Sequence, residues 1–179
     1  MKNRRILITL LFILTLGACA KPADMRTGAP LSLADFTENS VSVHIALEMD
    51  STGQAWLAGT FTPQREGFHL YSMTLPPNGI NGEGRPTRVE LAADSKMKVT
   101  GDLRESAYAE VSSMGPGTLL VYPAGPVTLS LPVSLPEGQG WVDDHVSVTY
   151  EACSDMTCLT PVTGKVVDVR IPSAGMIKP

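Results

Sequence analysis

The fold class is indicated by residues 41–49, which read Val41-Ser42-Val43-His44-Ile45-Ala46-Leu47-Glu48-Met49. Apolar side chains occupy every second position of this stretch. Side chains alternate between the two faces of an extended strand, so the apolar groups gather on one face and most polar groups on the other. Asp50 follows this stretch, and the three residues after it, Ser51-Thr52-Gly53, are typical of a turn. We therefore predict a half-buried β-strand over 41–49.

The same pattern recurs along the rest of the chain. We predict further strands at 54–61, 68–74, 87–92, 96–100, 118–122, 127–133, 146–150 and 167–171. The sequence contains 16 Gly and 14 Pro, which separate these segments and disfavour long helices. Short strands at this spacing predict an all-β fold in which two antiparallel sheets pack face to face.

Composition limits the number of domains and the kinds of partner. The chain has 179 residues, which favours a single domain, and its formal net charge is −4. Three of its basic residues, Lys2, Arg4 and Arg5, lie at the very start, so the remainder is more acidic still. Nucleic-acid binding depends on neutralising phosphates with Lys and Arg. We therefore expect no nucleic-acid partner.

The first residues have the features of a secretory leader. The basic start is followed by a mostly apolar run at 6–16, which is too short to cross a bilayer and fits a signal-peptide core. The run ends in Leu16-Gly17-Ala18-Cys19, which resembles the bacterial lipobox. That resemblance implies cleavage before Cys19 and a diacylglycerol on its thiol. An ordinary secretory signal with an incidental Cys remains the alternative.

These features suggest a division of the chain and an address. We expect a lipoprotein signal peptide at 1–18, the lipidated Cys19 and a flexible tether at 19–35, one domain at 36–172 and a tail at 173–179. Position 20 is Ala and not Asp. By resemblance to Gram-negative lipoproteins, this favours a periplasm-facing protein held in the outer membrane through its lipid anchor.

The two remaining cysteines, Cys153 and Cys158, flank a short turn between two predicted strands. A disulfide requires their Cα atoms to lie within about 7 Å. A bridge closing so short a loop contributes about 2 kcal/mol, compared with about 4.7 kcal/mol for a loop of about 100 residues. It would stabilise the fold little, which favours exchange chemistry. A structural bridge and a soft-metal site, with Cu(I) bound by the two thiolates and Met156, remain open.

The cysteine segment resembles that of the N-terminal periplasmic domain of the thiol:disulfide interchange protein DsbD. The shared pattern is Tyr150-x-x-Cys153, then Cys158-x-x-Pro161 before a final strand. The stretches at 67–71, 86–91 and 122–133 agree in order and spacing, so the resemblance covers about residues 36–172. It implies an immunoglobulin-like sandwich and a redox-active pair that passes electrons between periplasmic thioredoxin-like proteins, without a cofactor or a bound metal.

The resemblance also implies roles for individual residues. Cys158 would form the mixed disulfide with partners and Cys153 would resolve it. The family's two aromatic residues near the pair fall at His69 and Tyr71, of which His69 departs from a Tyr found in some members. Its imidazole either biases thiol ionisation or only fills space. The loop that caps the pair in the family would lie within 105–117.

The sequence departs from the familiar members of that family in two ways. It shows neither a membrane electron-transfer segment nor a thioredoxin domain, so we expect a separate reductant. The rival hypothesis is a structural or adaptor lipoprotein in which the disulfide is locked.

A second cluster, Asp143-Asp144-His145, has catalytic residue types, but its place after a Gly-rich turn predicts the start of a strand instead.

Overall fold

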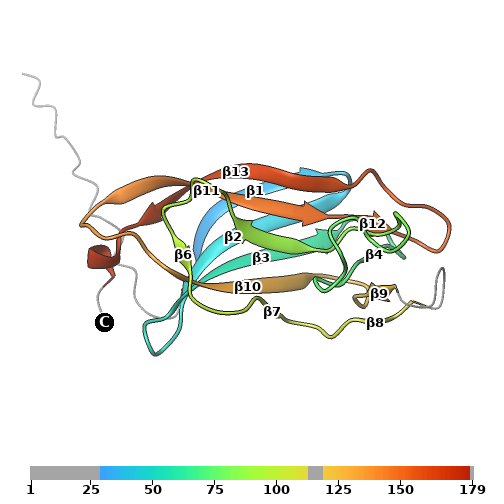
Figure 1. Ribbon diagram of the computed structural model, residues 1–179, viewed down its shortest axis with the longest axis horizontal. Helices are drawn as coiled ribbons and strands as arrows, with labels where there is room; N and C mark the ends of the chain where they lie inside the picture. Colours follow the sequence, from blue (N-terminus) through green and yellow to red (C-terminus); the bar gives the residue numbers. More distant parts are fainter. Residues whose placement is uncertain (1–28, 113–118, 178–179) are drawn as a thin grey trace, which may run out of the picture.

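The computed structural model describes residues 29–112 and 119–177, which fold almost entirely into antiparallel β-structure (Figure 1). The larger sheet has the order β1-β2-β3-β10-β6, with β7 also paired to β10. Its strands are β1 (Leu31–Glu38), β2 (Val41–Met49), β3 (Ala55–Pro63), β6 (Lys98–Val99), β7 (Arg104–Glu105) and β10 (Val127–Ser134). The second sheet has the order β13-β11-β5, formed by β5 (Arg88–Leu91), β11 (Trp141–Tyr150) and β13 (Val162–Pro172).

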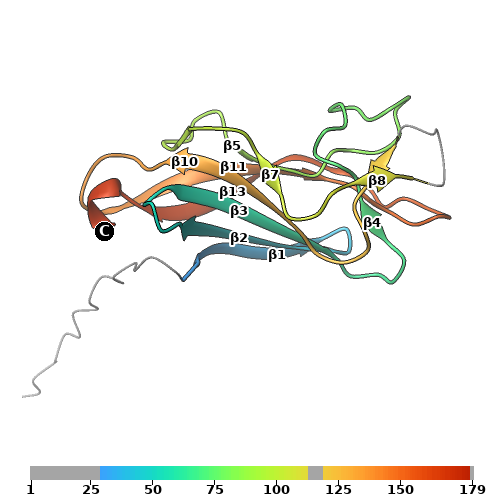
Figure 2. The same ribbon diagram turned by 90° about the horizontal axis from the view of Figure 1, so that it is seen from below.

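The core lies between these sheets, whose long strands run roughly along the long axis of the molecule (Figures 1 and 2). The alternating apolar residues of β2 are buried, as predicted, and they pack with those of β10, β11 and β13 in one continuous cluster. The prediction of an all-β sandwich of the immunoglobulin-like kind is confirmed. In the described part of the chain, the one helical segment is the short 3₁₀ turn η1 (Ala174–Met176). No helix there is long and apolar enough to cross a membrane.

The structure differs from the predicted strands at the start of the domain. Residues 31–35 were assigned to the tether, but they belong to β1, which pairs with β2 along its length. The assignment was wrong because a bulge between Ser32 and Ala34 shifts the register and interrupts the period-two pattern. The predicted strand at 68–74 is also much shorter, since regular pairing there is confined to β4 (His69–Leu70).

Two small sheets lie together at one end of the long axis (Figure 1). In one, β12 (Ala152–Cys153) pairs with β4. In the other, β8 (Glu110–Val111) pairs with β9 (Leu120–Val121). The start of β1 and the short turn η1 lie at the opposite end, far from the cysteine segment.

Candidate functional site

The site is built around a disulfide between Cys153 and Cys158. Cys153 ends β12, and the chain turns back so that the two Cα atoms lie 4.0 Å apart. The turn is held by backbone hydrogen bonds from Ser154 N to Thr157 O and from Leu159 N to Ala152 O. Only 1% of Cys153 is exposed, whereas Cys158 is exposed to solvent. The two sulfurs therefore differ in how easily another protein reaches them.

Strand β4 and the residue after it place two aromatic rings beside this pair. The backbone of His69 is registered with that of Cys153, and Tyr71 follows two residues later on the same face. The two rings contact edge to face, with their centroids 5.7 Å apart. The hydroxyl of Tyr71 lies 3.9 Å from Sγ of Cys158 and donates a long hydrogen bond to it. The structure thus brings together the four residues that the sequence indicated, namely the two cysteines, His69 and Tyr71.

Apolar side chains support the buried half of the site. Tyr71 and Cys153 pack in a small cluster of their own with Leu75 and Leu119. The loop at 76–86 adds Ile80 to this cluster. The cluster is separate from the main core, so the disulfide is anchored on a local platform between β4, β9 and this loop.

The loop at 76–86 approaches the site closely because of its glycines. A Cβ on Gly84 would lie 3.0 Å from the ring of Tyr71, and one on Gly79 would lie 2.0 Å from the carbonyl oxygen of Glu83. Both glycines also have positive φ, which other residues rarely adopt. The guanidinium of Arg85 donates to the carbonyls of Asn78, Gly82 and Gly84 and so holds the loop in this shape.

Burial sets the charge state of the two aromatic residues. It raises the pKa of Tyr71 to about 12, and the negative charges of Glu151 and Glu83 act in the same direction. It lowers the pKa of His69, although the nearby charge of Asp155 opposes the shift. At neutral pH the phenol therefore keeps its proton and can donate it to sulfur, while the imidazole is mainly uncharged.

Glu151 is a member of the site that the sequence analysis missed. The residue is 9% exposed, and its carboxylate oxygen and the sulfurs of Cys153 and Cys158 all lie within 4.8 Å of one another. Burial raises the pKa of the carboxyl, whereas the charge and the backbone N–H of Arg85 lower it. The only signal in the sequence was its position two residues before Cys153, and spacing alone does not show that a strand end turns the carboxyl towards sulfur.

The same three residues are the group that has metal-ligand geometry in the described part of the chain. The sulfurs are joined in a disulfide, so neither offers a thiolate in this state. Met156, the third ligand in the copper hypothesis, is 91% exposed. The geometry thus does not favour the copper hypothesis over exchange chemistry.

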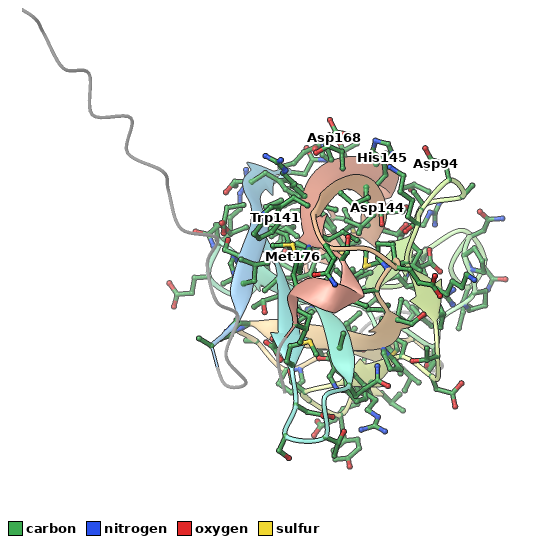
Figure 3. The ribbon with its side chains drawn as sticks, turned by 90° about the vertical axis from the view of Figure 1, so that its left-hand side faces the viewer. Asp94, Trp141, Asp144, His145, Asp168 and Met176 are labelled. Carbon is green, nitrogen blue, oxygen red and sulfur yellow. A yellow bond between two sulfur atoms is a disulfide. The ribbon has the colours of Figure 1, made fainter. Side chains whose placement is uncertain are left out.

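A second cluster of titratable groups lies away from the disulfide, towards the opposite end of β11 (Figure 3). Asp144 is 1% exposed and accepts hydrogen bonds from the backbone of Lys96, Met97 and His145. His145 lies between two exposed carboxylates, with Nδ1 3.0 Å from Asp94 and Nε2 3.4 Å from Asp168. Residues 143–145 belong to β11, as predicted, and Asp144 holds the segment at 95–97 against it.

Two expectations fall wholly or partly outside the described residues. Cys19 and the rest of the leader are among residues 1–28, and residues 113–117 belong to the segment in which the cap was expected. Of that segment, β8 at 110–111 pairs with β9, and Val121 of β9 forms a bridge with Tyr71. The loop at 76–86, which lies outside that segment, packs directly against Tyr71.

Comparison with known proteins yields structural likeness alone. No protein-family model matches the chain, and no curated protein matches it in sequence. The N-terminal periplasmic domain of ScsB from Proteus mirabilis matches 79% of this chain with a TM-score of 0.50 at 12% identity. The reduced N-terminal domain of DsbD from Neisseria meningitidis matches 65% of this chain and 76% of its own, with a TM-score of 0.41 at 14% identity.

The match to ScsB defines the class of fold. The chain is an immunoglobulin-like β-sandwich with a disulfide at one tip, and it shares the fold of the N-terminal periplasmic domain of ScsB. It spans about half the length of that solved chain, 51%. The fold implied by the resemblance to a DsbD N-terminal domain is therefore confirmed.

Proposed function

We propose that this protein is a periplasmic thiol–disulfide exchange module that passes two electrons between thioredoxin-like proteins through Cys153 and Cys158. The observation that carries the proposal is the unequal burial of the two sulfurs in a disulfide at the tip of the fold. Exchange requires one sulfur that a partner can attack and a second that resolves the mixed disulfide. Exposed Cys158 suits the first role, and buried Cys153 suits the second.

The surroundings of the pair support this assignment. Tyr71 reaches Cys158 from the protein side, and a protonated phenol stabilises a thiolate by donating a hydrogen bond to it. The core of the sandwich is closed without help from the disulfide, because Cys153 packs in a separate small cluster. Opening the bond therefore leaves the main core in place, as a cycling redox pair requires.

The reduction potential of the pair tests this function. The full chain carrying Cys19→Ser retains two thiols and is equilibrated in glutathione or dithiothreitol buffers, with the reduced fraction measured by alkylation. We expect a potential above about −300 mV and rapid exchange in the folded protein, since structural bridges typically lie below that value. A lower potential, or reaction only after unfolding, would make the pair a locked bridge and favour the adaptor hypothesis.

We further propose that Cys19 carries a lipid that holds the module in the outer membrane. The start of β1 lies at the end of the long axis opposite β12, so an anchor preceding β1 would direct the disulfide away from the membrane (Figure 1). Metabolic labelling with a fatty-acid analogue should mark the native chain and not the Cys19→Ser chain. Label in neither would show that the leader is an ordinary secretory signal, and fractionation of the two membranes tests the address.

A further inference from the structure

The carboxyl of Glu151 has no role in the function proposed so far, although it lies next to the disulfide. It stands at the junction between β11, which ends at Tyr150, and β12, which begins at Ala152. Its carboxylate lies within 4.8 Å of both sulfurs, and the residue as a whole is 9% exposed. Burying a carboxyl has a desolvation cost, so its position next to a reacting pair calls for a chemical explanation.

The exchange reaction creates a demand for a base at this place. In the first step the Cys158 thiolate attacks the disulfide of a partner, the Cys158–partner bond forms, and the first partner sulfur leaves and takes a proton from solvent. In the second step the Cys153 thiol loses its proton and attacks Sγ of Cys158. The Cys153–Cys158 bond forms and the second partner sulfur leaves as a thiolate, which takes a proton from solvent. The pair loses two electrons, which reduce the partner's disulfide to two thiols.

The second step is the one that needs help from the protein. A thiol reacts as its thiolate, and Cys153 is 1% exposed, so water has little access to its proton. A general base works within hydrogen-bond distance or through one water molecule, and such contacts are often longer outside the reacting complex. The Glu151 carboxylate lies within 4.8 Å of sulfur. This distance fits a contact made through one water molecule, or one that shortens in the reacting complex.

The other charged groups around the site are less suited to accept this proton. Tyr71 already holds its own proton, and the guanidinium of Arg85 has no acceptor atom. Glu83 and Asp155 are exposed. The charge of Glu83 raises the pKa of Tyr71, and the charge of Asp155 raises the pKa of His69. His69 is the one rival, because its backbone is registered with Cys153 and its imidazole is mainly uncharged. It therefore has to be tested beside Glu151.

We propose that Glu151 accepts the proton of the Cys153 thiol when the mixed disulfide is resolved, and returns it to Cys153 when the pair is reduced. This inference rests on the function proposed above. The raised pKa of the carboxyl supports it, because a carboxylate with a raised pKa is a stronger base and is closer in basicity to a thiol. The nearby charge and backbone N–H of Arg85 limit that rise.

The test separates the two steps in time. The reduced full chain carrying Cys19→Ser is mixed with dithiobis(nitrobenzoate), an aromatic disulfide that releases one coloured thiolate when Cys158 attacks and a second when Cys153 resolves. Glu151→Gln keeps the size of the side chain but removes its titration. We expect Glu151→Gln to leave the rate of the first phase unchanged and to slow the second phase at least about tenfold. Loss of a general base usually slows a reaction by a factor of about 10² to 10⁴, so tenfold is the minimum expected. The second phase should also lose part of its pH dependence.

Three further variants serve as controls. Asp155→Asn removes one negative charge from the cysteine turn, His69→Phe removes the rival acceptor, and both should keep a normal second phase. Glu151→Asp keeps a carboxyl and should slow the second phase less than Glu151→Gln, which separates loss of the base from loss of the fold.

Two results would overturn the inference. One is a normal second phase in Glu151→Gln after a normal first phase. The other is an equal loss in Asp155→Asn or His69→Phe. In both cases the proposed function would stand. If the native chain itself showed no first phase at Cys158, the proposed function would fail and the inference with it.

Discussion

The hydroxyl oxygen of Tyr71 lies 3.9 Å from Sγ of Cys158, which links the best-buried aromatic ring of the site to its most accessible sulfur. Tyr71 is 5% exposed, while Cys158 is open to solvent. The phenol therefore contacts the sulfur from the protein side and leaves the outer side free for a partner. This relationship gives the exposed cysteine a defined environment, from which the reactivity of the pair can be predicted.

Tyr71→Phe should make Cys158 less acidic in the reduced protein. The variant removes a hydrogen bond that favours the thiolate, which is typically worth about 0.5–1.5 kcal/mol, so the midpoint pH of alkylation should rise by up to about one unit. The pH dependence of the iodoacetamide reaction measures the shift. Tyr108→Phe is the matched control, since Tyr108 is 88% exposed and should show no change. An equal shift in both variants would contradict the explanation.

The two thiols of the reduced chain should react at very different rates. Cys158 should be alkylated first, because Cys153 is 1% exposed in the folded protein. Peptide mass spectrometry of briefly treated protein identifies the modified residue, and Cys153→Ala should accumulate mixed disulfides with partners at Cys158. Preferential labelling of Cys153 would reverse the proposed roles of the two residues.

His69→Phe should leave the midpoint of Cys158 alkylation where it is. Burial lowers the pKa of His69, so the imidazole carries little positive charge at the pH where thiols ionise. A clear upward shift would show instead that a cation at this position favours the thiolate. The experiment therefore decides between the two hypotheses for His69, namely that its imidazole biases thiol ionisation or that it only fills space.

The same variant should alter the dependence of stability on pH. Because the pKa of His69 is lower in the folded state, the unfolded chain binds more protons as the pH falls below about 6.5, and stability is lost in that window. Urea unfolding at about pH 7.5 and about pH 5.5 measures the loss. The native chain should lose more stability than His69→Phe over this interval, and equal losses would mean that another group dominates.

Reduction of the disulfide should weaken the fold without unfolding it. A loop of about six residues is worth about 2 kcal/mol by chain entropy, which is small for a sandwich with a continuous core. Urea unfolding of the Cys19→Ser chain with and without dithiothreitol measures the difference. Loss of the cooperative transition on reduction would show that the pair is structural.

The period-two pattern was sufficient to predict the long strands. The predicted strand at 41–49 matches β2 residue for residue, and the segments at 54–61 and 127–133 correspond closely to β3 and β10. Such strands bury one face, so their side chains must alternate. β1 escaped detection because its bulge breaks the alternation, and β4 was predicted too long because its neighbours Tyr71 and Ser72 are buried in irregular backbone.

The sequence by itself determined that strands form, where their apolar faces lie and that Cys153 and Cys158 are close enough along the chain to pair. These properties depend on residue type and short-range spacing. Only the tertiary structure decided that Cys153 is buried while Cys158 is exposed, and that Tyr71, Glu151 and the loop at 76–86 meet at the disulfide. Such contacts arise when segments far apart in the chain pack together, and the burial that results sets both the accessibility of sulfur and the charge of its neighbours.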